Sequence, residues 1–137
     1  MKRYIAPVAL VPLLLLPCSA NAQTRELTLT CSGTATNVLG SSVPETVKDM
    51  GIVVNLTAKT VSGFIPVAAA SVYQIDEVTI NFHGYDKDPS TYPWNFVSGT
   101  MDRITGRLVA TTIEQLSKDK HNNFTWELTC VPKKRLF

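Results

Sequence analysis

Groups that carry most enzyme chemistry are scarce in this sequence. It has two histidines, His83 and His121, and no Gly-X-Ser-X-Gly segment. A serine or cysteine nucleophile needs a general base within hydrogen-bond reach, and two histidines allow few such arrangements. A pair of carboxylates drawn from Asp86, Asp88 and Asp102 is formally compatible with glycoside hydrolysis. Since solvated loop acids are far commoner, we expect these aspartates to be solvated and the protein not to be an enzyme.

Beyond residue 22 the sequence also has no long apolar run. Before that point a basic start, residues 1–3, leads into an apolar run over 4–16 and then into Ala20-Asn21-Ala22. This order predicts a secretory signal peptide over 1–22, with cleavage between Ala22 and Gln23 and a single domain over 23–137. The apolar run is too short for a membrane span of roughly 20 residues, so no stable membrane insertion is expected after cleavage.

The leader leaves one alternative open. Residues 15–18 partly resemble a lipoprotein motif, in which Cys18 would be lipidated, although Pro17 fits that motif poorly. Either way the chain is exported, and we expect a periplasmic or secreted protein.

An excess of positive charge is missing as well. Removing 22 residues from the 137-residue chain leaves 115, and the loss of Lys2 and Arg3 leaves 11 basic against 11 acidic residues. A neutral surface has no broad field to hold a polyanion, so we expect no nucleic-acid partner. The basic cluster at residues 133–135 is interpreted as a solvated tail.

Two cysteines remain after the leader, Cys31 and Cys130. Two cysteines in an oxidising compartment predict one disulfide, and no CxxC or HxxxH segment supports a metal site instead. Each cysteine shares the apolar face of a segment that alternates with period two, as a half-buried strand does. A bond between the first and last strands predicts a meander whose ends meet in a closed or nearly closed barrel.

The remaining pattern predicts an all-β fold of about eight short antiparallel strands. We expect them over residues 26–34, 51–58, 60–67, 72–75, 78–83, 94–101, 107–113 and 123–131. The alternation loses its phase at Asp76-Glu77, which indicates a bulge or tight turn. Helical signal is confined to residues 42–45, which have the spacing of a capping box, so at most one short helix is expected before Gly51.

The segment MDRITGRL, residues 101–108, gathers an acid, two bases and a glycine. Asp102 at its start and Gly106 four residues later suit a hairpin loop built on a type I turn with a left-handed residue. We therefore interpret it as a turn, with Ile104 folding back over the barrel rim.

The connection over residues 83–94 carries the candidate binding residues. Its aspartates begin like a calcium loop, but Thr91 and Val97 stand where that loop needs glycine and glutamate, so no metal or cofactor is expected. Tyr85, Tyr92 and Trp94 gather in it. Such rings either plug the barrel mouth or form a recognition surface. Ser98 and Arg103, in and beside the following hairpin, are the alternative site.

The pattern LTC, VSGTMDRITGRL and WELTCVPKKRLF resembles a group of small exported bacterial proteins without an assigned activity. More distantly, Leu29-Thr30-Cys31 and Ser98-Gly99 resemble the first strand and the inhibitory loop of the periplasmic lysozyme-inhibitor family, although the residues after Gly99 depart from that loop. That resemblance implies a small barrel with a disulfide. The sequence thus predicts an exported binding module for an unknown protein or small ligand, with an inhibitor of lysozyme or another hydrolase as the alternative.

Overall fold

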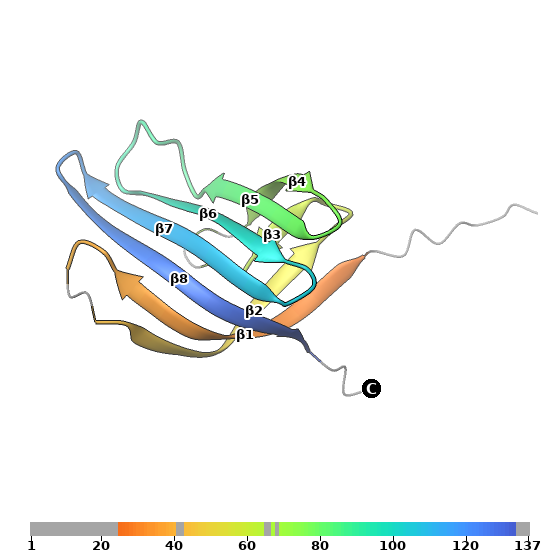
Figure 1. Ribbon diagram of the computed structural model, residues 1–137. Helices are drawn as coiled ribbons and strands as arrows, with labels where there is room; N and C mark the ends of the chain where they lie inside the picture. The colour runs from red at the N-terminus through yellow and green to blue at the C-terminus, as the bar shows by residue number, and fades with distance from the viewer. Residues whose placement is uncertain (1–24, 41–42, 65–66, 68, 134–137) are drawn as a thin grey trace, which may run out of the picture.

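The computed structural model describes residues 25–40, 43–64, 67 and 69–133. These residues form eight antiparallel strands, each paired with its neighbours along the chain, and β8 returns to pair with β1 (Figure 1). The predicted closed all-β barrel is therefore confirmed. The strands are β1 (Glu26–Asn37), β2 (Glu45–Asn55), β3 (Thr60–Ser62), β4 (Ala70–Ile75), β5 (Thr79–Tyr85), β6 (Trp94–Asp102), β7 (Arg107–Ser117) and β8 (Lys120–Pro132).

Alternation of side chains fills the barrel interior. In β1 the buried residues are Leu29, Cys31 and Ala35, and in β8 they are Leu128 and Cys130, each two or four positions from the next. Because successive side chains of a strand point to opposite faces, this spacing sends one set into the barrel and the other to solvent. The apolar residues on the inner face form one continuous core.

The disulfide joins the two strands that close the barrel. Cys31 and Cys130 stand directly opposite each other in the β1–β8 ladder, with 4.0 Å between their Cα atoms and 99 residues between them in sequence. The predicted pairing is confirmed.

The expected helix before Gly51 is wrong, because residues 45–50 belong to β2. They pair with β1 from Ala35 to Cys31, through an irregularity in the ladder near Ser32. Asp49 lies at that irregularity with a positive φ of 54°, and its N–H donates to Ser32 Oγ at 3.1 Å. Barrel pairing satisfies this backbone across the sheet, which overrides a local capping signal.

The third expected strand is much shorter than predicted, and β1, β7 and β8 are longer. β3 ends at Ser62, because Gly63 adopts a φ of 126° that ends the ladder. The phase slip at Asp76-Glu77 is a tight turn, in which the N–H groups of Val78 and Thr79 donate to Asp76 Oδ1 at 2.9 and 2.6 Å.

The segment 101–108 is a turn, as predicted. The N–H groups of Ile104 and Thr105 donate to Asp102 Oδ1 at 2.8 and 2.9 Å, and Gly106 has a φ of 73°. A left-handed residue at this position suits glycine, since it has no Cβ to clash. The expectation for Ile104 is wrong: its side chain is 76% exposed, because the turn points it into solvent and not over the rim.

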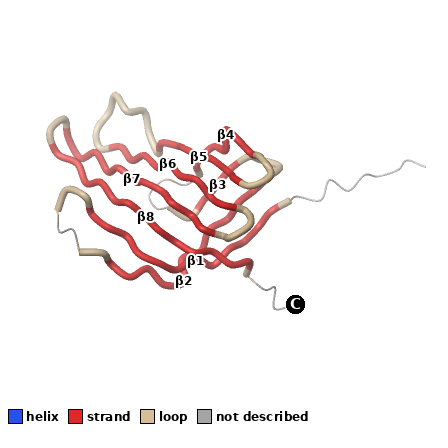
Figure 2. Tube along the Cα trace, in the orientation of Figure 1, coloured by secondary structure: helices blue, strands red, loops and turns tan. Residues whose placement is uncertain are grey.

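The barrel has two distinct ends. The connections β1–β2, β3–β4, β5–β6 and β7–β8 lie at one end, which we call the mouth end, and the turns β2–β3, β4–β5 and β6–β7 lie at the other, which we call the turn end (Figure 1). Figure 2 shows the β5–β6 connection as a long loop standing beside the β7–β8 hairpin. In the described ranges all regular structure is strand.

A candidate ligand cavity in the barrel mouth

The mouth end encloses a cavity of about 250 Å³. Its walls are largely aromatic, with the Phe64 and Trp126 rings meeting edge to face at a centroid distance of 5.9 Å and Phe124 tilted against Trp126 at 6.5 Å. The main apolar lining residues are Ala35, Phe64, Val67, Phe124 and Trp126. An apolar concavity with a few polar groups is the usual form of a small-molecule site.

Phe96 and Ile113 also line the cavity, together with four polar residues: Glu45, Asn95, Thr112 and Glu114. Thr112 and Glu114 follow Leu108 and Ala110 at two-residue steps, so they continue the inner face of β7 into the mouth. Asn95 stands opposite Glu114 in the β6–β7 ladder and is only 9% exposed. The inner faces of β6 and β7 therefore change from apolar to polar toward the mouth.

The donor groups around the cavity are largely engaged. Trp126 Nε1 donates to Thr112 Oγ1 at 2.9 Å, and Asn122 Nδ2 donates to Glu114 Oε2 at 2.8 Å. Asn95 Nδ2 donates to Asp86 Oδ2 at 2.7 Å. A carboxylate only accepts, so this contact fixes which atom of the Asn95 amide is the nitrogen and leaves Oδ1 on the other side.

Asp86 is not the solvated loop acid that the sequence predicts. It is half-buried and also accepts a hydrogen bond from the Asn95 backbone N–H at 2.6 Å. Burial raises the pKa of Asp86, but the hydrogen bonds from Asn95 outweigh it, and the pKa lies below its usual value. Asp88 matches the expectation better, since it is exposed and its Oδ1 accepts from the Ser90 N–H of the same turn at 2.9 Å.

Unpaired buried polar atoms gather at the mouth end. In the part of the chain that the structure describes, three buried side-chain atoms have no hydrogen-bond partner: Trp94 Nε1, Asn95 Oδ1 and Asn123 Oδ1. Trp94 and Asn95 begin β6, and Asn123 lies near the start of β8. Such atoms are uncommon in native proteins and mark places where a water or a ligand supplies the partner. Of the three residues, Asn95 lines the cavity.

The aromatic residues expected at the mouth lie mostly on the outside of the barrel. Tyr85 stands opposite Phe96, with ring centroids 4.7 Å apart, and Trp94 meets Tyr85 at 5.8 Å. Gly84 and Val97, their inward neighbours, form the adjacent pair of the ladder, so these three rings face outward. We call Tyr85, Trp94 and Phe96 the outer aromatic cluster. Tyr85 is 49% exposed and Tyr92, in the loop, is 50% exposed.

Tyr85, Tyr92 and Trp94 are not among the residues that line the cavity, and Phe64, Phe124 and Trp126 fill the mouth instead. Trp126 is partly buried and packs against the core from its mouth side. Phe124 and Trp126 alternate in phase with Leu128 and Cys130 along β8. This alternation in the sequence was enough to place both rings on the inner face. Phe64 gave no comparable signal, because it lies outside any strand.

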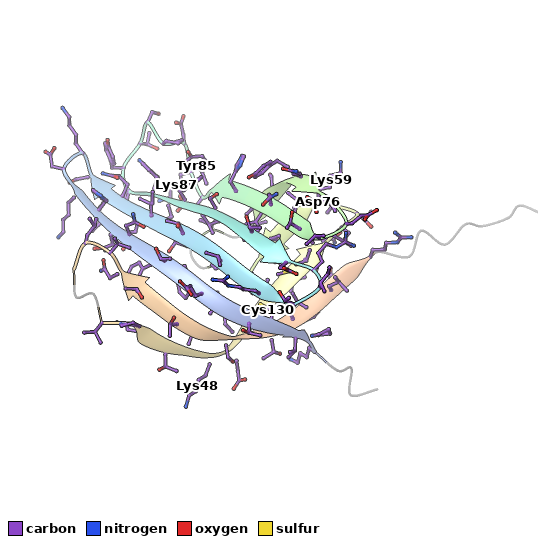
Figure 3. The ribbon with its side chains drawn as sticks, viewed as in Figure 1. Lys48, Lys59, Asp76, Tyr85, Lys87 and Cys130 are labelled. Atoms are coloured by element: carbon purple, nitrogen blue, oxygen red, sulfur yellow. A yellow bond between two sulfur atoms is a disulfide. The ribbon has the colours of Figure 1, made fainter. Side chains whose placement is uncertain are left out.

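Ser98 and Arg103 are not brought together. Ser98 lies within β6, opposite His83 and Thr111, and is therefore in a strand and not in a loop. Arg103 lies at the turn end, where its Nη1 donates to the Asp76 carbonyl. Figure 3 shows Tyr85 and Lys87 at the mouth end and Asp76 toward the opposite end of the barrel.

Among the described residues, no group of three or more His, Cys, Asp or Glu side chains is placed to hold a metal ion. His83, one of the two histidines, stacks on Tyr73 at a centroid distance of 4.9 Å. Residues 25–40, 43–64, 67 and 69–133 contain no helix long and apolar enough to cross a membrane. The signal peptide predicted over residues 1–22 lies outside the described residues. Comparisons of the chain with protein-family models, with curated proteins and with solved structures find no match.

Proposed function

We propose that this protein is an exported binding module that takes a small molecule into the mouth cavity. The observation that carries the proposal is the Asn95 side chain, which is buried at the cavity wall with Oδ1 unpaired. A buried acceptor without a partner costs about 1–3 kcal/mol. A ligand that donates a hydrogen bond there would recover this free energy.

The cavity fits this role better than the outer aromatic cluster does. Tyr85 contacts both Trp94 and Phe96, and of these three residues only Phe96 lines the cavity. The mouth offers a concavity with further aromatic walls in Phe64, Phe124 and Trp126. At about 250 Å³ the cavity falls below the roughly 300–1,000 Å³ of pockets for drug-sized ligands. The expected ligand is therefore small, with one ring or a short alkyl chain.

The two tryptophans allow a direct test. Trp126 lines the cavity and Trp94 does not, and the sequence has no others. In a Trp94→Phe variant the fluorescence of Trp126 alone reports on the mouth. We would titrate this variant with three probes of similar shape: 2-phenylethylammonium, 2-phenylethanol and 3-phenylpropanoate.

We expect the fluorescence of Trp126 to change saturably with at least one probe. No change with any of the three at 10 mM, a concentration on the order of the Kd of the weakest specific binding, would overturn the proposal. Ala35→Leu, which fills the cavity from β1, should abolish the change. Tyr85→Ala, in the outer aromatic cluster, is the matched control and should leave it intact. If Tyr85→Ala abolishes binding and Ala35→Leu does not, the ligand sits outside the barrel and the mouth is not the site.

We further propose that the protein acts in the periplasm or outside the cell. The disulfide supports this, since such bonds form and persist in oxidising compartments. The basic and apolar leader with Ala20-Asn21-Ala22 supports it as well. Intact-mass analysis of the protein made by its native host should find a chain that begins at Gln23. A lipid-modified chain beginning at Cys18 would contradict this processing.

A further inference from the structure

We infer that the ligand of the mouth cavity is a small organic cation, a protonated amine with an aromatic or alkyl part. This inference rests on the proposed function and specifies the class of ligand. It starts from the charged side chains of the lining, which are Glu45 and Glu114 and include no lysine, arginine or histidine.

Neither carboxylate is neutralised by the protein. In the described part of the chain the only ion pair joins Arg107 to Glu127 on the exposed surface at 3.8 Å, so no cationic side chain pairs with Glu45 or Glu114. Glu114 is half-buried and its Oε2 accepts from Asn122, while no described cationic side chain pairs with it. A half-buried carboxylate beside an apolar cavity favours a positive charge in that cavity, because the field is screened less there than in water.

The hydrogen-bonding side chains point to the same class. Trp126 Nε1 donates to Thr112, and the Asn122 and Asn95 amides each donate to a carboxylate. The side-chain donors left at the wall are the Thr112 hydroxyl and the second N–H of the Asn95 amide. The acceptors at the wall are Asn95 Oδ1, which has no hydrogen-bond partner among the described residues, and the carboxylates of Glu45 and Glu114, of which Glu114 Oε2 accepts from Asn122. An ammonium group has three donors and no acceptor, which complements this set. An anion would meet two carboxylates and would find few donors.

The aromatic walls complete the fit. Phe64, Phe124 and Trp126 present apolar surface for the hydrocarbon part of the ligand. Their ring faces also attract a cation, and tryptophan does so most strongly. A purely hydrophilic cation such as a metal ion would gain nothing from these walls, so the structure favours an organic amine.

The same three probes separate this inference from the proposed function. We expect 2-phenylethylammonium to bind at least about tenfold tighter than 2-phenylethanol, because hydrogen bonds from a charged donor are stronger than those from a neutral one. We expect 3-phenylpropanoate to bind weakest of the three. Equal affinity for the ammonium and the alcohol, or tightest binding of the carboxylate, would overturn the cation class while leaving the cavity as the site. Failure of all three would overturn the proposed function, and this inference with it.

Charge-neutralising variants locate the preference. Glu114→Gln keeps an oxygen to accept from Asn122 but removes the charge, and it should reduce the preference for the ammonium over the alcohol several-fold. Glu45→Gln, at the exposed rim, should do the same more weakly and provides the test if Glu114→Gln does not fold. Glu127→Gln removes an exposed carboxylate elsewhere on the barrel and is the matched control. Glu127→Gln should leave the preference for the ammonium unchanged. If Glu45→Gln and Glu114→Gln also leave it unchanged, the two carboxylates of the lining do not select the ligand.

Discussion

The Asp86 carboxylate and Asn95 close the base of the longest described loop through three hydrogen bonds. Asn95 donates to both carboxylate oxygens, and the Asp86 backbone N–H donates to the Asn95 carbonyl at 3.1 Å. The same asparagine lines the mouth cavity. The loop and the cavity wall are thus held by one pair of residues.

This pairing predicts that two aspartates of one loop differ in their contribution to stability. Asp86→Ala leaves the two Asn95 donors without their acceptor, and the free energy of unfolding should fall by about 1–3 kcal/mol. Asp88→Ala removes an exposed turn contact and should cost about 0.5 kcal/mol or less. Urea unfolding of both variants measures the difference. Equal and small losses would show that Asp86 is as weakly held as Asp88.

The turn aspartates also predict how stability depends on pH. Backbone N–H donors of the same turns lower the pKa of Asp76, Asp88 and Asp102, and Asn95 lowers that of Asp86 against the opposing effect of burial. A carboxyl whose pKa is lower in the folded state binds fewer protons there than in the unfolded chain. Its stabilisation is therefore complete above the usual value of 3.8 and is lost as the pH falls through the folded value.

Thermal unfolding between pH 7 and pH 2 tests this. We expect the Tm to stay nearly constant down to about pH 5 and then to fall steeply below about pH 4. Asp86→Asn removes one of the four contributions and should flatten the acid limb. Asp119→Asn, which removes an exposed carboxylate of the β7–β8 turn, serves as the control. An acid limb that is equally steep in both variants would contradict the assignment to Asp86.

The barrel was predictable because its signals are local or periodic. Alternation identified most of the strands, and the phase of Cys31 and Cys130 placed both cysteines on inner faces. The turn at Asp102 to Gly106 was predictable because a side-chain acceptor and a glycine determine it within five residues. The segment before Gly51 was not, since its capping signal is local whereas its pairing with β1 depends on the closure of the whole barrel.

The candidate site was predictable only in part. Tyr85 and Trp94 meet because they flank one hairpin connection, and sequence proximity was enough to group them. The cavity brings together Phe64, Asn95, Glu114 and Trp126 from four separate parts of the chain. Which of these meet is decided by strand register and by the stagger of the barrel, and neither is written in any short segment. The one local sign of a site in the sequence is that Thr112 and Glu114 are polar although they continue the inner face of β7.

Close packing between β5, β6 and β7 predicts a penalty for any side chain at residue 99. A Cβ on Gly99 would lie 2.6 Å from Phe82 Cζ and 2.9 Å from Ala110 Cβ, both inside the barrel. Gly99→Ala should therefore lower the free energy of unfolding by about 1–3 kcal/mol through overpacking. Gly51→Ala is the matched control, since nothing lies within 4 Å of its added Cβ. That variant should be neutral or more stable by about 0.4–1 kcal/mol. If Gly99→Ala and Gly51→Ala have the same free energy of unfolding, the side chains around residue 99 can move to accommodate the added methyl group.

The disulfide should supply a large share of the stability. The bond between Cys31 and Cys130 spans 99 residues, and in the chain-entropy account a loop of about 100 residues is worth roughly 4.7 kcal/mol. A domain of this size has a total stability of about 5–15 kcal/mol. Both sulfurs lie in the core, between strands that pair directly, so the native barrel already holds the cysteines together and the bond acts chiefly by restricting the unfolded chain.

Replacing the cysteines separates this effect from local packing. Cys31→Ala, Cys130→Ala and the double variant should show nearly the same large loss of Tm, because each breaks the same cross-link and the two changes are not additive. Peptide mapping without reductant should recover one cross-linked pair from the wild-type protein. If the double variant is much less stable than either single variant, the cysteines contribute mainly as separate buried side chains. Two free thiols in the wild-type protein would show that the bond does not form, and the barrel would then be closed by β1–β8 pairing alone.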